Sequence, residues 1–262
     1  MIRNIIYISL YTLLPAGLIV LMSFAVDRNL QKECSSLHVT VNSRSGNHFI
    51  RSESIRENIT TSVDSLEGHP PDPHTMQQLR SIVHNIPWVE QANIYRTING
   101  EVKVSATLRD PLFRVINRQN NSFYVDKDGV MFPLSEEHTA RVMLATGYIN
   151  MDYSPGFAIQ RGEQEELSEK VYTMRKLYNV ARFIHDDPFW EAFIDHIHIT
   201  RNGSLELTPK NGAHIIEFGS PDNLEEKFRK LRLFYRRGLP EVGWHYYSRV
   251  NVKFNKQIVC TK

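Results

Sequence analysis

The stretch from Ile86 to Pro111 places the strongest constraint on the fold, because its pattern is typical of a β-hairpin. Asn99-Gly100 lies between two extended runs, and this dipeptide favours the two positive φ angles of a two-residue type I′ turn. Over residues 102–108, apolar and polar side chains alternate. This period of two predicts a strand with one face on a core and the other in water. Pro111 cannot donate to a sheet ladder, so we expect the strand to end just before it.

The hairpin closes a first domain that we expect over residues 37–110. An alternating pattern that begins at Leu37 predicts its first strand. Apolar spacing then predicts two helices, one capped by Ser52 or Ser54 and one over residues 75–85. With the two hairpin strands, the order is strand, helix, helix, strand, strand. This order is typical of a compact α+β unit.

After Pro111 the sequence predicts a second, mixed β-rich domain with two helices over residues 111–262. Helical spacing covers residues 165–185 and returns at Ser220 or Asp222, ending at Gly238. The expected strands follow turn signals such as Asp-Gly and Asn-Gly and cover residues 113–116, 123–125, 130–132, 142–144, 193–199, 205–207, 215–218 and 249–259. The strand at 249–259 is the last element that we expect.

Residues 5–26 carry no charged side chain, and about 20 such residues cross a bilayer as a helix. A cleaved signal peptide is the alternative, because Ser23-Phe24-Ala25 offers small residues for cleavage. The run is longer than a usual signal-peptide core, which favours a retained transmembrane helix. We therefore expect residues 1–4 in the cytoplasm, residues 27–36 as a linker, and the bulk of the chain outside.

The charge balance argues against a nucleic-acid partner. The 262 residues include 31 Lys and Arg and 29 Asp and Glu, for a net charge of +2. This charge gives no long-range field of the kind that holds DNA or RNA. Cys34 and Cys260 could form a disulfide in an oxidising compartment, but nothing in the sequence brings them together.

The sequence does not predict an enzyme. His196 and His198 lie two apart in an expected strand and could share a metal with Asp187 or Asp195. A pair without an obvious third ligand is better interpreted as a solvated or core-edge pair. Residues 218–222 could hold an anion at a helix start, although a plain N-cap is the simpler use. Hydrolase, zinc-protease, Walker and dinucleotide motifs are lacking, so we expect no catalytic residue, metal or cofactor.

Three stretches together resemble the bacterial cell-division family FtsQ, called DivIB in Gram-positive species. The block that ends in Arg109-Asp110-Pro111 is similar to the end of that family's POTRA domain. Residues 123–133 resemble the hairpin that opens its β domain, and residues 250–254 resemble its closing strand. A single N-terminal anchor ahead of these stretches fits the family as well.

The resemblance implies a non-enzymatic bitopic scaffold of the divisome, in the inner membrane at the septum. Its POTRA domain would recruit other division proteins, and its β domain would bind FtsB- and FtsL-like bitopic partners through the final strand. An edge strand can add a partner strand through unpaired backbone groups, although lysines also blunt solitary edges. The partner-binding residues expected from the match are Arg249, Val250, Val252, Lys253, Phe254, Asn255 and Lys256.

The other function that the sequence leaves open is a periplasmic POTRA-containing secretion or transport factor, or a secreted binding protein after signal-peptide cleavage. The two amphipathic helices predicted after the first domain argue against an outer-membrane barrel, which needs many alternating strands.

Overall fold

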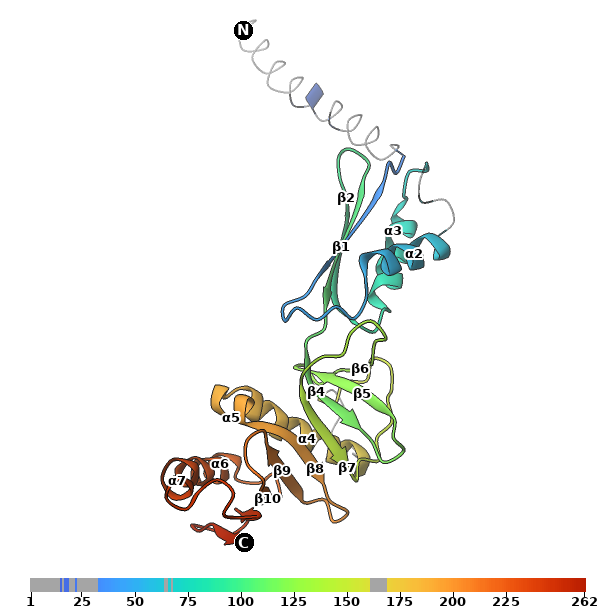
Figure 1. Cartoon of the computed structure of the whole chain (residues 1–262). Coiled ribbons are helices and arrows are strands. Elements are labelled where there is room, and N and C mark those ends of the chain that lie inside the picture. The colour runs from blue at the N-terminus through green and yellow to red at the C-terminus, as the bar shows by residue number, and fades with distance from the viewer. Residues whose placement is uncertain are drawn as a thin grey trace, which may run out of the picture. The chain divides into compact units, whose positions relative to one another are not determined.

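A computed structural model of the chain describes residues 33–63, 66, 68–160 and 169–262, together with Pro15, Gly17, Leu18 and Met22 (Figure 1). The chain divides into two compact units, with a division between Leu108 and Arg109. The first unit comprises Ile50–Leu108 and the described residues of Met1–Ser43. The second unit comprises Arg109–Lys262 and also the segment Arg44–Phe49.

The first unit has the predicted strand, helix, helix, strand, strand order. Its elements are β1 (Leu37–Asn42), α2 (Ser52–Ser62), α3 (Pro73–His84), β2 (Val89–Arg96) and β3 (Val102–Leu108). The sheet order is β1-β3-β2, with β1 parallel and β2 antiparallel to β3. In β3 the apolar side chains are buried and the polar ones half-buried, which confirms the alternation predicted from the sequence. The buried face packs on both helices around Ile55, Ile59 and Leu79.

The starts of the two helices differ from the prediction. The N-cap of α2 is Arg51, and no side chain there makes a capping hydrogen bond. Ser52 is already helical, so the predicted serine cap is wrong. Helix α3 begins at Pro73 instead of Thr75, because the Asp72 carboxylate accepts a hydrogen bond from the Thr75 N–H at 2.7 Å. An aspartate N-cap followed by proline is a common start for a helix.

The turn between β2 and β3 is also different in detail. Gly100 has a φ of 89°, whereas Asn99 does not take a positive φ. The Gly100 N–H donates to the Thr97 carbonyl at 3.1 Å, and the Thr97 N–H donates to Glu101 O at 2.9 Å. These bonds define a type I turn followed by a glycine bulge, so the predicted type I′ turn is wrong.

The second unit is built on one mixed nine-stranded sheet of order β12-β11-β10-β9-β8-β7-β4-β5-β6. Strands β4, β7 and β8 run parallel to one another, and β10 runs parallel to β11. The strands are β4 (Pro111–Ile116), β5 (Ser122–Asp126), β6 (Met131–Pro133), β7 (Met143–Gly147), β8 (Ile194–Ile199), β9 (Leu205–Pro209), β10 (Ile215–Gly219), β11 (Arg249–Asn251) and β12 (Val259–Thr261).

The second unit contains more helices than the two predicted. Helix α4 (Glu169–His185) and helix α6 (Leu224–Leu233) match the prediction in place, although residues 165–168 lie outside the described residues. The additional elements are α5 (Pro188–Phe193), the π-helix η1 (Phe234–Gly238) and α7 (Leu239–Val242). The chain therefore stays helical past Gly238. The N-cap of α6 is Asn223, with a φ of 56° and no side-chain cap, so the predicted caps at Ser220 and Asp222 are wrong.

The helices and the inward face of the sheet enclose one core. Buried aromatic and aliphatic side chains from α4, α5, α6 and the central strands form it, including Tyr178, Trp190 and Phe228. The Trp190 ring lies 4.9 Å from the Phe228 ring between centroids, which joins α5 to α6. This packing holds α6 against the C-terminal part of the sheet.

Within the described part of the chain, no helix is both long and apolar enough to cross a membrane. The predicted transmembrane helix at residues 5–26 lies outside the described residues, apart from Pro15, Gly17, Leu18 and Met22. Cys34 and Cys260 do not form a disulfide with each other. Cys34 is buried in the first unit, where its N–H donates to His69 O at 2.9 Å, so the packed part of this unit begins before Leu37.

Candidate functional site

The C-terminal residues 249–262 form two short strands joined by a turn. Strand β11 lies between β10 and β12, and β12 is the outermost strand of the sheet on this side. Lys256 in the turn has a φ of 59°. The prediction of one edge strand over residues 249–259 is therefore wrong. At this end of the sheet, the strand whose far side is unpaired among the described residues is β12, which begins where the predicted strand ends.

The predicted partner-binding residues fall into three groups. Val250 and Val252 are fully buried in the core, so their side chains cannot contact a partner. Arg249 and Lys253 form ion pairs within the unit. The exposed residues Phe254, Asn255 and Lys256 lie together on the turn between β11 and β12.

Glu217 on β10 organises the start of this region. Its carboxylate pairs with the Arg249 guanidinium, lies 2.9 Å from Lys253 Nζ, and accepts a hydrogen bond from Asn251 Nδ2 at 2.7 Å. The hydrogen bonds from Lys253 and Arg249 lower the pKa of Glu217. Arg249 also pairs with Glu206 on β9. Three neighbouring strands are thus tied together by charge on the polar face of the sheet.

Two lysines of α6 hold the loops on either side of this region. Lys227 Nζ donates to Phe218 O at 3.2 Å and to Ser220 O at 2.6 Å, and burial lowers its pKa. Lys230 Nζ donates to Val252 O at 3.2 Å and to Phe254 O at 2.6 Å. The backbone of the turn is therefore fixed to α6, while the Phe254 side chain remains 47% exposed.

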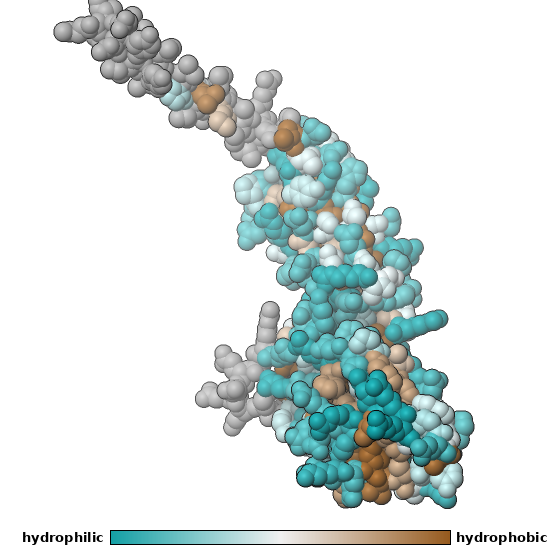
Figure 2. Space-filling view, turned by 90° about the vertical axis from the view of Figure 1, so that its left-hand side faces the viewer, coloured by the Kyte–Doolittle hydropathy of each residue, from teal (hydrophilic) through white to brown (hydrophobic). Residues whose placement is uncertain are grey.

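Exposed apolar side chains gather around the same end of the second unit, and we call this set the C-terminal apolar surface. Figure 2 shows a run of hydrophobic residues between hydrophilic ones there. Its members have exposed fractions of 40–55% and are Leu233, Val242, Trp244, Tyr246, Phe254 and Val259. Large exposed apolar clusters commonly mark interaction sites. Of these residues, only Phe254 was predicted from the sequence to contact a partner, although the aromatic run 244–247 was a visible signal.

A buried histidine lies behind this surface. His214 is 1% exposed, and its Nε2 shares a hydrogen bond with the Tyr235 hydroxyl at 2.7 Å. Its Nδ1 has no hydrogen-bond partner among the described residues. Trp244 stacks on Tyr235 with a centroid distance of 6.0 Å. His214 therefore lies under the loop that leads into β11.

We expect this histidine to make the second unit less stable in acid. Burial lowers the pKa of His214, so the unfolded chain binds more protons below the ordinary histidine pKa of about 6.5. The unfolding free energy should fall between about pH 7 and pH 5, by about 1.4 kcal/mol for each unit of pKa difference. Urea unfolding at several pH values measures this loss. His214→Gln should reduce this slope without abolishing it, because burial also lowers the pKa of His196 in the same unit. His48→Gln, at an exposed position, is the matched control. Equal slopes in all three proteins would contradict the assignment.

The histidine pair considered as a metal site contacts a threonine. Thr146 Oγ1 lies 2.8 Å from His196 Nε2 and 3.2 Å from His198 Nδ1. Asp187 instead pairs with Arg232 and accepts a hydrogen bond from the Phe189 N–H at 3.0 Å. Across residues 33–160 and 169–262, apart from the few positions left undescribed, no group of three His, Cys, Asp or Glu residues is placed to hold a metal ion.

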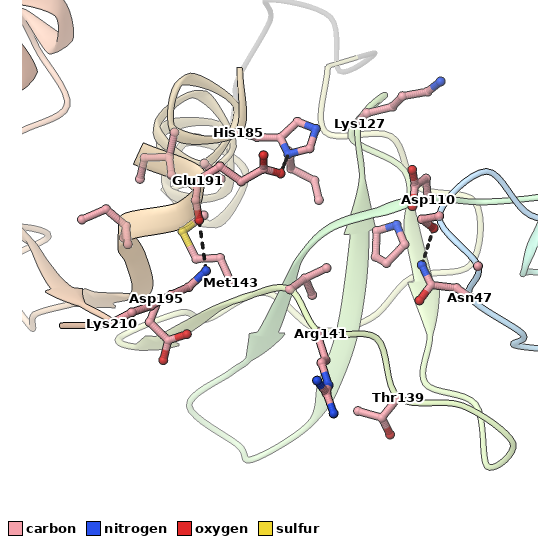
Figure 3. Close-up of a pocket in the computed structure, with 18 of the residues that line it drawn as sticks. Asn47, Asp110, Lys127, Thr139, Arg141, Met143, His185, Glu191, Asp195 and Lys210 are labelled. Carbon is pink, nitrogen blue, oxygen red and sulfur yellow. Dashed lines mark hydrogen bonds and ion pairs between the residues drawn. The ribbon is translucent and has the colours of Figure 1, made fainter. Parts of the chain in front are cut away.

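A groove of about 870 Å³ lies elsewhere in the second unit (Figure 3). Its rim carries both signs of charge, and His185 Nδ1 lies 2.7 Å from a Glu191 oxygen. Lys210 Nζ donates to the Glu191 backbone carbonyl at 3.1 Å. Because cations and carboxylates are mixed around it, the groove does not select one charge class of ligand, and we assign none.

Comparison with known families agrees with this architecture. Residues 32–107 match the POTRA-like domain model, and residues 110–261 match the model described as FtsQ/DivIB, C-terminal related. No curated protein matches the chain. The second match covers more than half of the 262 residues and includes the whole C-terminal edge. The chain therefore belongs to the FtsQ/DivIB family, with a POTRA-like domain preceding the family's C-terminal domain.

Proposed function

We propose that this chain is a non-enzymatic, membrane-anchored scaffold of the bacterial divisome, located in the inner membrane at the septum with its bulk in the periplasm. It joins division proteins by binding FtsB- and FtsL-like bitopic partners at β12, while the POTRA-like domain contacts other divisome components. Family membership supports a division-related scaffold. The observation that carries the binding mode is the outermost position of β12 next to the C-terminal apolar surface.

Binding by strand addition would use both the unpaired side of β12 and the C-terminal apolar surface beside it. The Thr261 carbonyl accepts from the Ser248 N–H at 2.8 Å, so it points toward β11. Because these directions alternate along an antiparallel strand, the N–H and C=O of Cys260 point away from the sheet. A partner strand can bond to them, and its side chains can pack on Phe254 and Val259, which are about half exposed. Main-chain bonds would supply affinity, and the apolar contacts would supply specificity.

Cysteine crosslinking tests the binding mode directly. Val259→Cys and Thr261→Cys are made in full-length protein that carries Cys34→Ser and Cys260→Ser, and the FtsB-like partner is scanned with single cysteines. If a strand is added, disulfides should form at alternate partner positions, because side chains alternate along a strand. The matched control is Tyr172→Cys, an exposed position on α4. Disulfides at partner positions spaced three or four residues apart would indicate that the partner binds as a helix, and would contradict strand addition.

A second experiment separates an anchored scaffold from a secreted protein. Mass determination of the mature chain from washed membranes shows whether residues 1–26 are retained. Retention is expected for a bitopic scaffold, because a transmembrane helix inserts in an effectively irreversible manner. Release of a chain lacking these residues into the periplasm would contradict the proposal.

A further inference from the structure

The tip of the β2–β3 hairpin in the first unit carries an exposed isoleucine. Ile98 occupies the first central position of the type I turn, and its side chain is 75% exposed, the largest fraction among the exposed large apolar residues that the structure describes. That turn position accepts most residue types, and polar ones are common in turns. The turn geometry itself therefore does not select an isoleucine at this position.

The residues just behind the tip, Tyr95 and Lys103, are amphipathic, whereas Ile98 at the tip is apolar. Tyr95 is 47% exposed on β2 and lies opposite Lys103 on β3 in the antiparallel register. Lys103 Nζ is 3.8 Å from the Glu101 carboxylate, and its side chain is 44% exposed. An apolar tip followed by tyrosine and lysine matches the order of groups found from the acyl boundary to the headgroups of a bilayer.

The chain enters the first unit at the same end as this tip. The Ser35 N–H donates to Gly100 O at 3.3 Å, and the Val102 N–H donates to Ser36 O at 3.0 Å. The predicted membrane span ends at Val26. Nine fully extended residue steps reach at most about 30 Å, so the tether keeps the tip near the bilayer surface. Such tethering gives a high local concentration, and even a weak contact is then populated.

We infer that the β2–β3 tip is a membrane-contact finger, in which Ile98 enters the outer boundary of the lipid bilayer and Tyr95 lies at the headgroups. The inference rests on the membrane anchor of the proposed function. The contact would orient the POTRA-like domain at the membrane surface. Its ligand is the lipid surface itself, recognised by one apolar side chain with aromatic and cationic groups behind it.

Spin-label accessibility in reconstituted protein tests the inference. Ile98→Cys, Tyr95→Cys and Asn85→Cys are each labelled in full-length Cys34→Ser/Cys260→Ser protein, in vesicles of phosphatidylethanolamine and phosphatidylglycerol. Asn85 is the matched control, because it is exposed and lies before the other end of β2. The ratio of collisions with oxygen to collisions with a nickel chelate should be several-fold higher at position 98 than at 85, with position 95 between them.

The outcomes separate this inference from the proposed function. If the protein stays in carbonate-washed vesicles but the label at position 98 is as accessible to the nickel chelate as the label at 85, the finger is wrong and the anchor stands. If the protein leaves the vesicles, the anchor itself is wrong. Shielding at position 98 that appears only when a partner protein is added would assign the tip to a protein contact and overturn the lipid assignment. Circular dichroism of each variant checks that the fold is retained.

Discussion

Replacing Asp126 with alanine is expected to lower the unfolding free energy of the second unit by about 3–5 kcal/mol. Asp126 ends β5 and is 2% exposed. One carboxylate oxygen accepts from Arg109 Nη1 at 2.7 Å, and the other accepts from the backbone N–H groups of Asp128 and Val130 at 2.9 and 2.8 Å. Alanine leaves a largely buried guanidinium and two N–H groups without these acceptors, and such losses are costly.

Two further variants make the Asp126 prediction specific. Asp126→Asn retains a side-chain oxygen for the turn and removes the ion pair, so its loss should be intermediate. Asp128→Ala changes an exposed side chain in the same turn and should stay within about 0.5 kcal/mol of wild type. Urea unfolding followed by tryptophan fluorescence in a Trp88→Phe background, which leaves Trp190 and Trp244 as the emitters, reports on the second unit. A loss for Asp126→Ala no larger than that for Asp128→Ala would refute the prediction.

At the Asp126 site, the local turn could be predicted from the sequence, but the long-range ion pair could not. The Asp-Lys-Asp-Gly turn was visible, and the structure places a positive φ of 77° at Gly129 as such a turn requires. The partner of Asp126 is Arg109, which lies 17 positions away in the chain. Local periodicity carries no signal for such a contact. Alternation in β3 was predictable because it depends only on neighbouring residues and one buried face.

The C-terminal edge was harder to predict because its strands are short. Strands β11 and β12 have three residues each, which is too few to show a period of two. The turn between them uses Lys256 in the left-handed region, where glycine would have been the recognisable signal. As a result, the sequence did not show that the Val252 backbone is bonded within the fold. Its N–H donates to Glu217 O at 3.1 Å, so Val252→Pro would break a bond of the fold and could not report on partner binding alone.

Helix α5 was not predicted, although its start has a recognisable signal in the sequence. Asp187-Pro188 is an N-cap followed by a proline at the first helical position, which predicts a helix start, and α5 begins there. By contrast, the exposure of Trp244 is decided by which elements cover it. Helical spacing places Leu231 inward correctly, and it also turns Leu233, two positions further along α6, away from that face, where it is 55% exposed.

Replacing Phe254 with alanine is expected to weaken binding of the FtsB-like partner at least tenfold, while the protein stays folded. Truncating a central aromatic anchor of an interface typically costs about 2 kcal/mol or more. The Phe254 ring is 47% exposed, whereas its backbone carbonyl is held by Lys230. The turn therefore keeps its position without the ring, and the unfolding free energy should change by no more than about 0.5 kcal/mol.

Tyr172→Ala is the matched control for Phe254→Ala, because Tyr172 is an aromatic residue on α4 with 50% exposure. Titration of a labelled partner ectodomain against each full-length variant measures affinity, and urea unfolding of the same samples measures stability. We expect a loss of partner affinity for Phe254→Ala only, because Tyr172 lies outside the C-terminal apolar surface. Wild-type affinity in Phe254→Ala would remove this residue from the interface. An equal loss in both variants would show that the effect does not depend on the surface beside β12.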